Sequence, residues 1–156
     1  MKEEKDLGNR VSFFLVLFII ALDQISKIVI QTFNVTYSFF GISIRYVQNT
    51  GAAFGLFQNN AFFLGIISIA VAIALIVYCA IGRVHYKLPY FLLIAGALGN
   101  GIDRIFRGFV IDFIDLGWWP VFNIADIAIT IGVLLLLIKE LFHSKKKKKN
   151  KKSKPL

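Results

Sequence analysis

The sequence predicts an all-α membrane protein with four transmembrane helices, a small amphipathic β-sheet on the outer membrane surface, and both termini inside the cell (N-in/C-in). Three observations predict this class. The chain of 156 residues is 57% hydrophobic, and its mean hydropathy of +0.70 exceeds that of ordinary soluble domains. The basic residues of its connections and ends gather on one side, apart from Arg45 and Arg107 in the outer connections.

The net charge of +9 does not indicate a nucleic-acid partner. Nine of the eighteen Lys and Arg residues lie between Lys139 and Lys154. The body from Val11 to Ile138 carries six basic and five acidic residues, a net of +1. It therefore has no basic face that could bind a phosphate backbone.

Four segments are long and apolar enough to cross the hydrocarbon core, which takes about 20 residues as a helix. They are Val11–Phe33, Ala61–Ile81, Leu88–Phe106 and Val121 to about Leu141. We expect residues 1–143 to form a single four-span domain. Residues 144–156 are predicted to be a disordered, polybasic cytoplasmic tail that anchors the topology near anionic lipid headgroups.

The orientation follows from the short basic connections. Arg83, His85 and Lys87 occupy the second connection and the lysine tail follows the fourth span, so both are expected inside. A cleaved signal peptide is the alternative for the N-terminal segment. The apolar run leads into Asp23 without a small-x-small cleavage site, which favours a retained span.

The first outer connection contains the pattern of a half-buried strand. Ile42, Ile44 and Tyr46 alternate with Ser43 and Arg45, the period of two that places one face of a strand on an apolar surface. The small residues 51–55 follow it and would allow another backbone to approach closely.

Three aspartates are expected to converge near the outer interface. Asp103 lies about one turn from the outer end of the third span, and Asp126 lies ~7 Å below the start of the fourth at 1.5 Å per residue. Asp112 lies on the connection between these spans. Asn100 and Asn123 each precede one of the aspartates by three residues on the same helical face. Intramembrane carboxylates are costly, so the cluster indicates a polar site.

A buried structural network is the alternative, with Arg104 pairing one aspartate and the asparagines satisfying the others. As chemistry, two adjacent carboxyl groups provide an acid and a base, because one keeps its proton while the other ionises. Cys79 has no nearby His, and His85 and His143 lack metal-ligand spacing. Hydrolysis by two aspartates without a cofactor or metal is therefore favoured.

The ordered motifs resemble the lipoprotein signal peptidases, or signal peptidase II, over nearly the whole chain. They are Asp23-Gln24 with Lys27, Asn49-Thr50-Gly51-Ala52-Ala53-Phe54-Gly55, Gly96-Ala97-Leu98-Gly99-Asn100 with Asp103-Arg104, Val110 to Asp115, and Phe122-Asn123-Ile124-Ala125-Asp126. Each motif alone is weak, but the five in order across four spans are specific.

This resemblance implies a membrane aspartic endopeptidase with Asp112 and Asp126 as the catalytic pair. The residues implied to support the site or contact substrate are Asp23, Asn49, Gly51, Asn100, Asp103, Arg104 and Asn123. The implied substrates are diacylglyceryl-modified prolipoproteins, cut before the lipidated cysteine. The implied inhibitor is globomycin, and the implied setting is a monomer among membrane lipids in the bacterial cytoplasmic membrane, with its site near the outer leaflet.

Two functions from other classes remain as alternatives. Membrane aspartates also mark ion or proton paths, but here they cluster at one interface and Asp112 lies outside any span. A lipid-binding scaffold without activity would leave the paired carboxylates with only a structural role.

Overall fold

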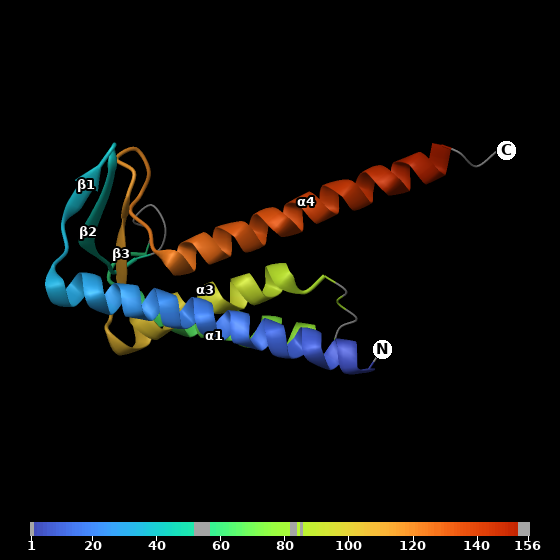
Figure 1. Ribbon diagram of the computed structural model, residues 1–156, viewed down its shortest axis with the longest axis horizontal. Helices are drawn as coiled ribbons and strands as arrows, with labels where there is room; N and C mark the ends of the chain where they lie inside the picture. The colour runs from blue at the N-terminus through green and yellow to red at the C-terminus, as the bar shows by residue number, and fades with distance from the viewer. Residues whose placement is uncertain (1, 52–56, 82–83, 85, 153–156) are drawn as a thin grey trace.

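The computed structural model describes residues 2–51, 57–81, 84 and 86–152. Over these residues the chain has four helices and one three-stranded sheet. In order these are α1 (Lys2–Phe33), β1 (Tyr37–Phe39), β2 (Ile42–Asn49), α2 (Ala61–Ile81), α3 (Leu88–Phe106), β3 (Val110–Asp115) and α4 (Ile124–Lys152). The sheet lies at one end of the helices, and both chain ends lie at the other (Figure 1).

Helix α3 is the centre of the bundle and contacts each of the other three helices. Its glycines make these contacts close. A Cβ on Gly99 would lie 2.8 Å from the Asp23 carboxylate of α1, and one on Gly96 would collide with the Ala125 carbonyl oxygen of α4. On the side facing α2, a Cβ on Gly101 would lie 2.8 Å from Ile69. Small residues at these positions let the backbones approach, as in other membrane helix pairs.

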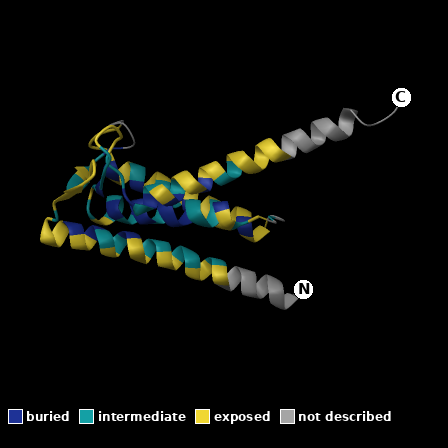
Figure 2. Cartoon of the chain, turned by 45° about the horizontal axis from the view of Figure 1, so that its top comes forward, coloured by how far each residue is buried: buried dark blue, intermediate teal, exposed yellow. Residues whose placement is uncertain are grey.

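The outward faces of the helices are apolar. Exposed residues run along the outer faces, while buried residues gather where the helices meet beneath the sheet (Figure 2). Phe13, Phe14 and Phe18 of α1 are each at least 60% exposed. So large an apolar surface is typical of helices that face lipid.

Two of the helices, over Val11–Phe33 and Ala61–Ile81, are long and apolar enough to cross a membrane by length and composition. They coincide with the first two predicted spans. Helices α3 and α4 occupy the third and fourth predicted segments, and these helices carry the amide and carboxyl groups discussed below.

Both boundaries of α4 differ from the sequence prediction. The helix begins at Ile124, not Val121, because Phe122 pairs with Ile114 in an isolated antiparallel bridge. It continues to Lys152, so residues 144–152 of the predicted disordered tail are helical. Lysine is a good helix former and simply extends the preceding turns.

The predicted sheet is present, and it contains β1 and β3 in addition to the one strand that the alternation indicated. The strands are antiparallel in the order β1-β2-β3, and β2 pairs with β3 from Ser43↔Asp115 to Asn49↔Val110, with an irregularity between Ile44 and Val47. Phe40 and Gly41 form the turn between β1 and β2, both with positive φ, as a two-residue hairpin turn requires. Residues 52–55 of the small-residue motif lie outside the described residues.

Candidate active site

Asp112 lies in the middle of β3 and is only 2% exposed. One carboxylate oxygen accepts a hydrogen bond from Asn123 Nδ2 at 2.7 Å, and the other accepts from Asn49 Nδ2 at 2.9 Å. Burial, followed by the nearby Asp126 carboxyl, raises the pKa of Asp112 to about 6, although both amide donors act in the opposite direction. Asp112 therefore exchanges its proton close to neutral pH.

Asp126 lies in the first turn of α4, where it forms a reciprocal cap with Asn123. The Asp126 backbone N–H donates to Asn123 Oδ1 at 3.0 Å, and the Asn123 backbone N–H donates to Asp126 Oδ2 at 3.1 Å. This is the arrangement of a capping box. Asn100 Nδ2 donates to the other Asp126 oxygen at 2.8 Å. The carboxyl group thus accepts one hydrogen bond on each oxygen, and the backbone of the same residue is held by Asn123.

Both aspartates line one cavity of about 570 Å³ between the sheet and the adjacent ends of α3 and α4. Its wall also includes Asn49, Gly51, Asn100 and Arg104 from the predicted site, together with Trp119 and Phe122 of the β3–α4 connection. A cavity of this volume is large enough to enclose a short peptide segment.

Arg104 joins α3 to the end of β2. A guanidinium nitrogen donates to the Gly51 carbonyl oxygen at 2.9 Å, and the Gly51 N–H donates to Asn49 Oδ1 at 3.0 Å. The Arg104 Nε atom is buried and has no hydrogen-bond partner among the described residues. The Asn49–Gly51 turn is therefore fixed beside the carboxylates by a cation.

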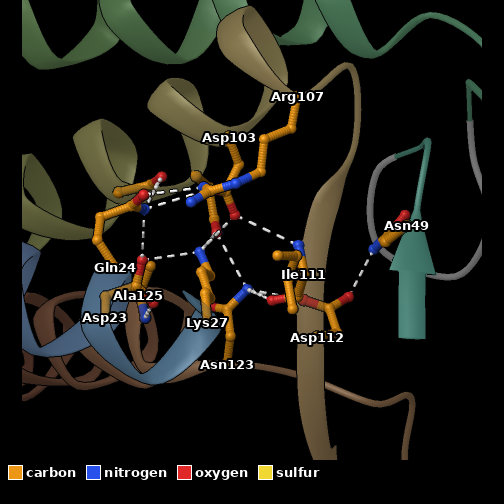
Figure 3. A network of polar contacts seen from close by, with 12 residues as sticks. Asp23, Gln24, Lys27, Asn49, Asp103, Arg107, Ile111, Asp112, Asn123 and Ala125 are labelled. Carbon is orange, nitrogen blue, oxygen red and sulfur yellow. Dashed lines mark hydrogen bonds and ion pairs between the residues drawn. The ribbon is translucent and has the colours of Figure 1, made fainter. Parts of the chain in front are cut away.

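A second polar cluster lies directly behind this cavity, at the junction of α1 and α3 (Figure 3). Lys27 Nζ lies 2.7 Å from Asp23 Oδ2, 2.8 Å from Asp103 Oδ2 and 3.0 Å from Asn100 Oδ1, and its side chain is fully buried. Arg107 pairs with Asp103 and donates to Gln24 Oε1 at 2.9 Å. Gln24 Nε2 in turn donates to Asp103 Oδ1 at 3.1 Å.

The structure divides the predicted site residues into a front layer, which lines the cavity, and a rear layer, which lies behind it. Six of them line the cavity: Asn49, Gly51, Asn100, Arg104, Asp112 and Asp126. Asp23, Asp103 and Asn123 lie behind that wall. The expected convergence of three aspartates into one pocket is therefore wrong for Asp103, whose carboxylate faces Lys27 and Arg107. The alternative in which Arg104 pairs with one aspartate also differs from the described residues, where Arg104 donates to the Gly51 carbonyl oxygen and the cations paired with Asp103 are Lys27 and Arg107.

Sequence reasoning gave no role to Gln24, Lys27 or Arg107. Two of them had a usable signal. Lys27 follows Asp23 by four residues and Arg107 follows Asp103 by four, the spacing at which opposite charges meet on one helical face. Asn123 was expected one helical turn before Asp126, but it caps the helix from outside.

The described residues include no group of three or more His, Cys, Asp and Glu side chains placed to hold a metal ion. Proton transfer is within the capacity of the groups that are present. Two carboxyl groups share a cavity, and carboxyl groups close together do not both ionise readily.

An apolar helical bundle that carries such a cavity beneath its surface sheet defines a membrane enzyme. Comparison with known proteins gives the particular family. The chain belongs to the signal peptidase II family, whose family model, described as "Signal peptidase (SPase) II", matches residues 15–142. It is therefore a membrane peptidase.

Several relatives are similar over most of their length. A lipoprotein signal peptidase of Syntrophomonas wolfei is 45% identical over 141 residues, which cover 86% of this chain and 95% of that one. A lipoprotein signal peptidase of Staphylococcus aureus is 40% identical over 152 residues, covering 88% and 91%.

Two solved structures have a similar fold, both of a bacterial membrane enzyme determined by the in meso method. One has a TM-score of 0.79 and 35% identity, covering 94% of each chain. The other has a TM-score of 0.72 and 34% identity, covering 84% of this chain and 92% of its own.

Proposed function

We propose that this chain is an aspartic endopeptidase that removes signal peptides from diacylglyceryl-modified prolipoproteins. It cuts the peptide bond just before the lipidated cysteine, with Asp112 and Asp126 as the catalytic pair. The observation that carries this proposal is that both carboxyl groups line one cavity and are held there by separate donors.

The mechanism needs one proton on the pair. The ionised member takes a proton from a water molecule whose oxygen attacks the scissile carbonyl carbon. The protonated member donates to the carbonyl oxygen as negative charge develops there. When the C–N bond breaks, the proton taken from water passes to the departing amine, and a hydroxyl group of the tetrahedral intermediate returns its proton to the other aspartate as the new carboxyl group forms. The pair then again holds one proton.

The surrounding residues suit this chemistry by holding the pair still. Asn49 and Asn123 each donate to one oxygen of Asp112, and Asn100 donates to Asp126. Positioned donors of this kind lower the cost of reorganisation during the reaction. Arg104 and Gly51, which are joined by a hydrogen bond, form the adjacent wall where substrate backbone would lie.

The same proposal includes a membrane placement. Four spans in an N-in/C-in arrangement put the sheet and the site near the outer leaflet of the bacterial cytoplasmic membrane. The position of both chain ends opposite the sheet supports this topology (Figure 1). A substrate with a helical signal segment and two acyl chains would reach the site laterally through lipid. We also propose that the enzyme acts as a monomer among membrane lipids, and that globomycin occupies the cavity.

The test uses three Asp→Asn variants assayed on a lipidated proprotein and on its unlipidated cysteine form. Asp112→Asn and Asp126→Asn should each abolish cleavage of the lipidated form in folded protein. Asp115→Asn is the matched control on the same strand, because Asp115 pairs with Arg45 at 2.6 Å and does not line the cavity. Near-normal turnover by Asp112→Asn would refute the two-aspartate mechanism.

A further inference from the structure

Lys27 is a fully buried cation that does not line the cavity, and the proposed mechanism gives it no role. Its ammonium group contacts three acceptors: the carboxylates of Asp23 and Asp103 and the side-chain oxygen of Asn100. An ammonium group has three donors, so its hydrogen-bonding capacity is filled. Removing a charged group from water costs free energy. A buried cation whose donors are all hydrogen-bonded therefore indicates a specific role.

The contact with Asn100 determines how that residue faces the catalytic pair. Lys27 can only donate, so the Asn100 atom beside it must be the oxygen. The amide NH2 group is then directed to Asp126 Oδ1, at 2.8 Å. The same Asn100 oxygen accepts from Asn123 Nδ2 at 3.0 Å, and that nitrogen also donates to Asp112. Asp126 is therefore connected to Lys27 through one amide, Asn100, and Asp112 through two, Asn100 and Asn123.

The charges of the two layers balance in a specific way. In the rear layer, Asp23 and Asp103 oppose Lys27 and Arg107, which gives −2 + 2 = 0. In the front layer, Arg104 faces two carboxyl groups, which gives +1 − 2 = −1 with both ionised and 0 with one proton present. Because an uncompensated charge is costly in a buried site, the neutral state is the one with a single proton on the pair.

The charged groups around the pair come from every element packed against it. Helix α1 contributes Asp23 and Lys27, α3 contributes Asp103, Arg104 and Arg107, β3 contributes Asp112, and α4 contributes Asp126. Strand β2 has one charged residue, Arg45. It pairs with Asp115 at the end of the β2–β3 pairing that lies away from Asn49. Helix α2 has no charged residue.

We propose that Lys27 is a positioning residue that keeps one member of the Asp112–Asp126 pair ionised, by balancing the rear carboxylates and by orienting Asn100. The proposal rests on the two-aspartate function. Burial is the main cause that raises the pKa of Asp112, and the charge of Lys27 opposes that rise. Without Lys27, the buried site would be neutral only with both catalytic carboxyl groups protonated, and that state has no base.

The test compares Lys27→Met, Asp23→Asn and the double variant, which together form a double-mutant cycle in charge. The measurement is the pH profile of kcat/KM on lipidated proprotein, with its acidic and basic limbs. Lys27→Met leaves one extra negative charge, so both limbs of the profile should move up by about one pH unit, an estimate for a unit charge at this separation. Asp23→Asn leaves one extra positive charge, so both limbs should move down. The double variant restores the balance, and its limbs should return close to those of the wild type.

The rate provides a second readout. In the double variant Asn100 has no ammonium partner, so kcat should stay below the wild-type value although the pH limbs recover. A purely structural role for Lys27 would lower the amount of folded enzyme without moving the limbs. The proposal would be overturned if the limbs of the pH profile did not move in the single variants. It would also be overturned if the limbs of the double variant were shifted as far as those of Lys27→Met. If Lys27→Met does not fold, the downward shift in Asp23→Asn and its reversal in the double variant decide the question.

This outcome is separate from the test of the proposed function. Loss of cleavage in Asp112→Asn and Asp126→Asn with unmoved limbs in the charge cycle would reject the role of Lys27 alone. Near-normal cleavage by Asp112→Asn would instead reject the aspartate pair itself.

Discussion

The side chain of Asn123 donates to Asp112 at 2.7 Å while its oxygen caps the first turn of α4 that carries Asp126. One amide therefore connects the two carboxyl groups of the cavity. Its backbone N–H also donates to Asp126, so this residue fixes the distance and orientation between strand β3 and helix α4.

Asn123→Ala should reduce both stability and turnover. Loss of the cap should lower the free energy of unfolding by about 1–2 kcal/mol, and loss of the donor to Asp112 should reduce kcat roughly 100-fold through mispositioning. Thermal unfolding and a cleavage assay measure the two effects. Asn60→Ala is the control. Asn60 directly precedes α2, and its hydrogen bonds within the part of the chain that the structure describes are local, to Gln58 and Phe57 and from Leu64, so kcat should stay within a few-fold of wild type.

The pH dependence of the wild-type enzyme should be bell-shaped. Burial raises the pKa of Asp112 to about 6 beside Asp126, so the pair loses its last proton above about pH 6. At lower pH both members become neutral and no base remains. We expect kcat/KM on lipidated substrate to decline on both sides, with apparent pKa values that belong to the pair. A profile that is flat from pH 4 to 8 would contradict this protonation scheme.

Gly96→Ala should damage the site through packing alone. The added Cβ would collide with the Ala125 carbonyl oxygen, and backbone at that point cannot yield as a flexible side chain does. The start of α4 should move away from α3 and carry Asp126 with it, so we expect cleavage to fall at least tenfold with a lower unfolding temperature. Ala74→Val adds bulk at an exposed position of α2 and should have little effect on either measurement.

The proposed topology can be read by cysteine labelling in whole cells. The background is Cys79→Ala, because Cys79 is the single native cysteine and is buried. Ser38→Cys and Trp118→Cys, at exposed positions of the sheet end, should react with an impermeant maleimide from outside. Ser144→Cys should react only after the membrane is opened. The opposite pattern would reverse the orientation argued from the basic connections.

The helical segments could be predicted from sequence because hydropathy over about 20 residues depends only on the local chain. The first two predicted spans match helices that are long and apolar enough to cross a membrane. The start of α4 could not be placed in this way. Val121 and Phe122 are apolar, but Phe122 forms a bridge with Ile114, and Asn123 begins a cap that hydropathy does not detect.

The site was partly predictable for a similar reason. The sequence grouped Asp112 and Asp126 with their asparagines through residue type and spacing, and the structure brings all four together. It could not tell which neighbour each face of α3 meets. Asp103 and Asn100 are three residues apart, yet Asp103 faces the cations of the rear layer while Asn100 reaches the cavity. That division depends on how α1 packs on α3.

The strand that carries Asp112 has a consequence for how the enzyme is made. Strand β3 pairs with β2, which precedes α2 in the chain, and Asp126 arrives only with the last helix. A nascent chain that ends before Ile124 thus has the first carboxyl group and no partner for it. Under the proposed two-aspartate mechanism, the chain cannot cleave a substrate until α4 lies beside α3 and brings Asp126 to Asp112.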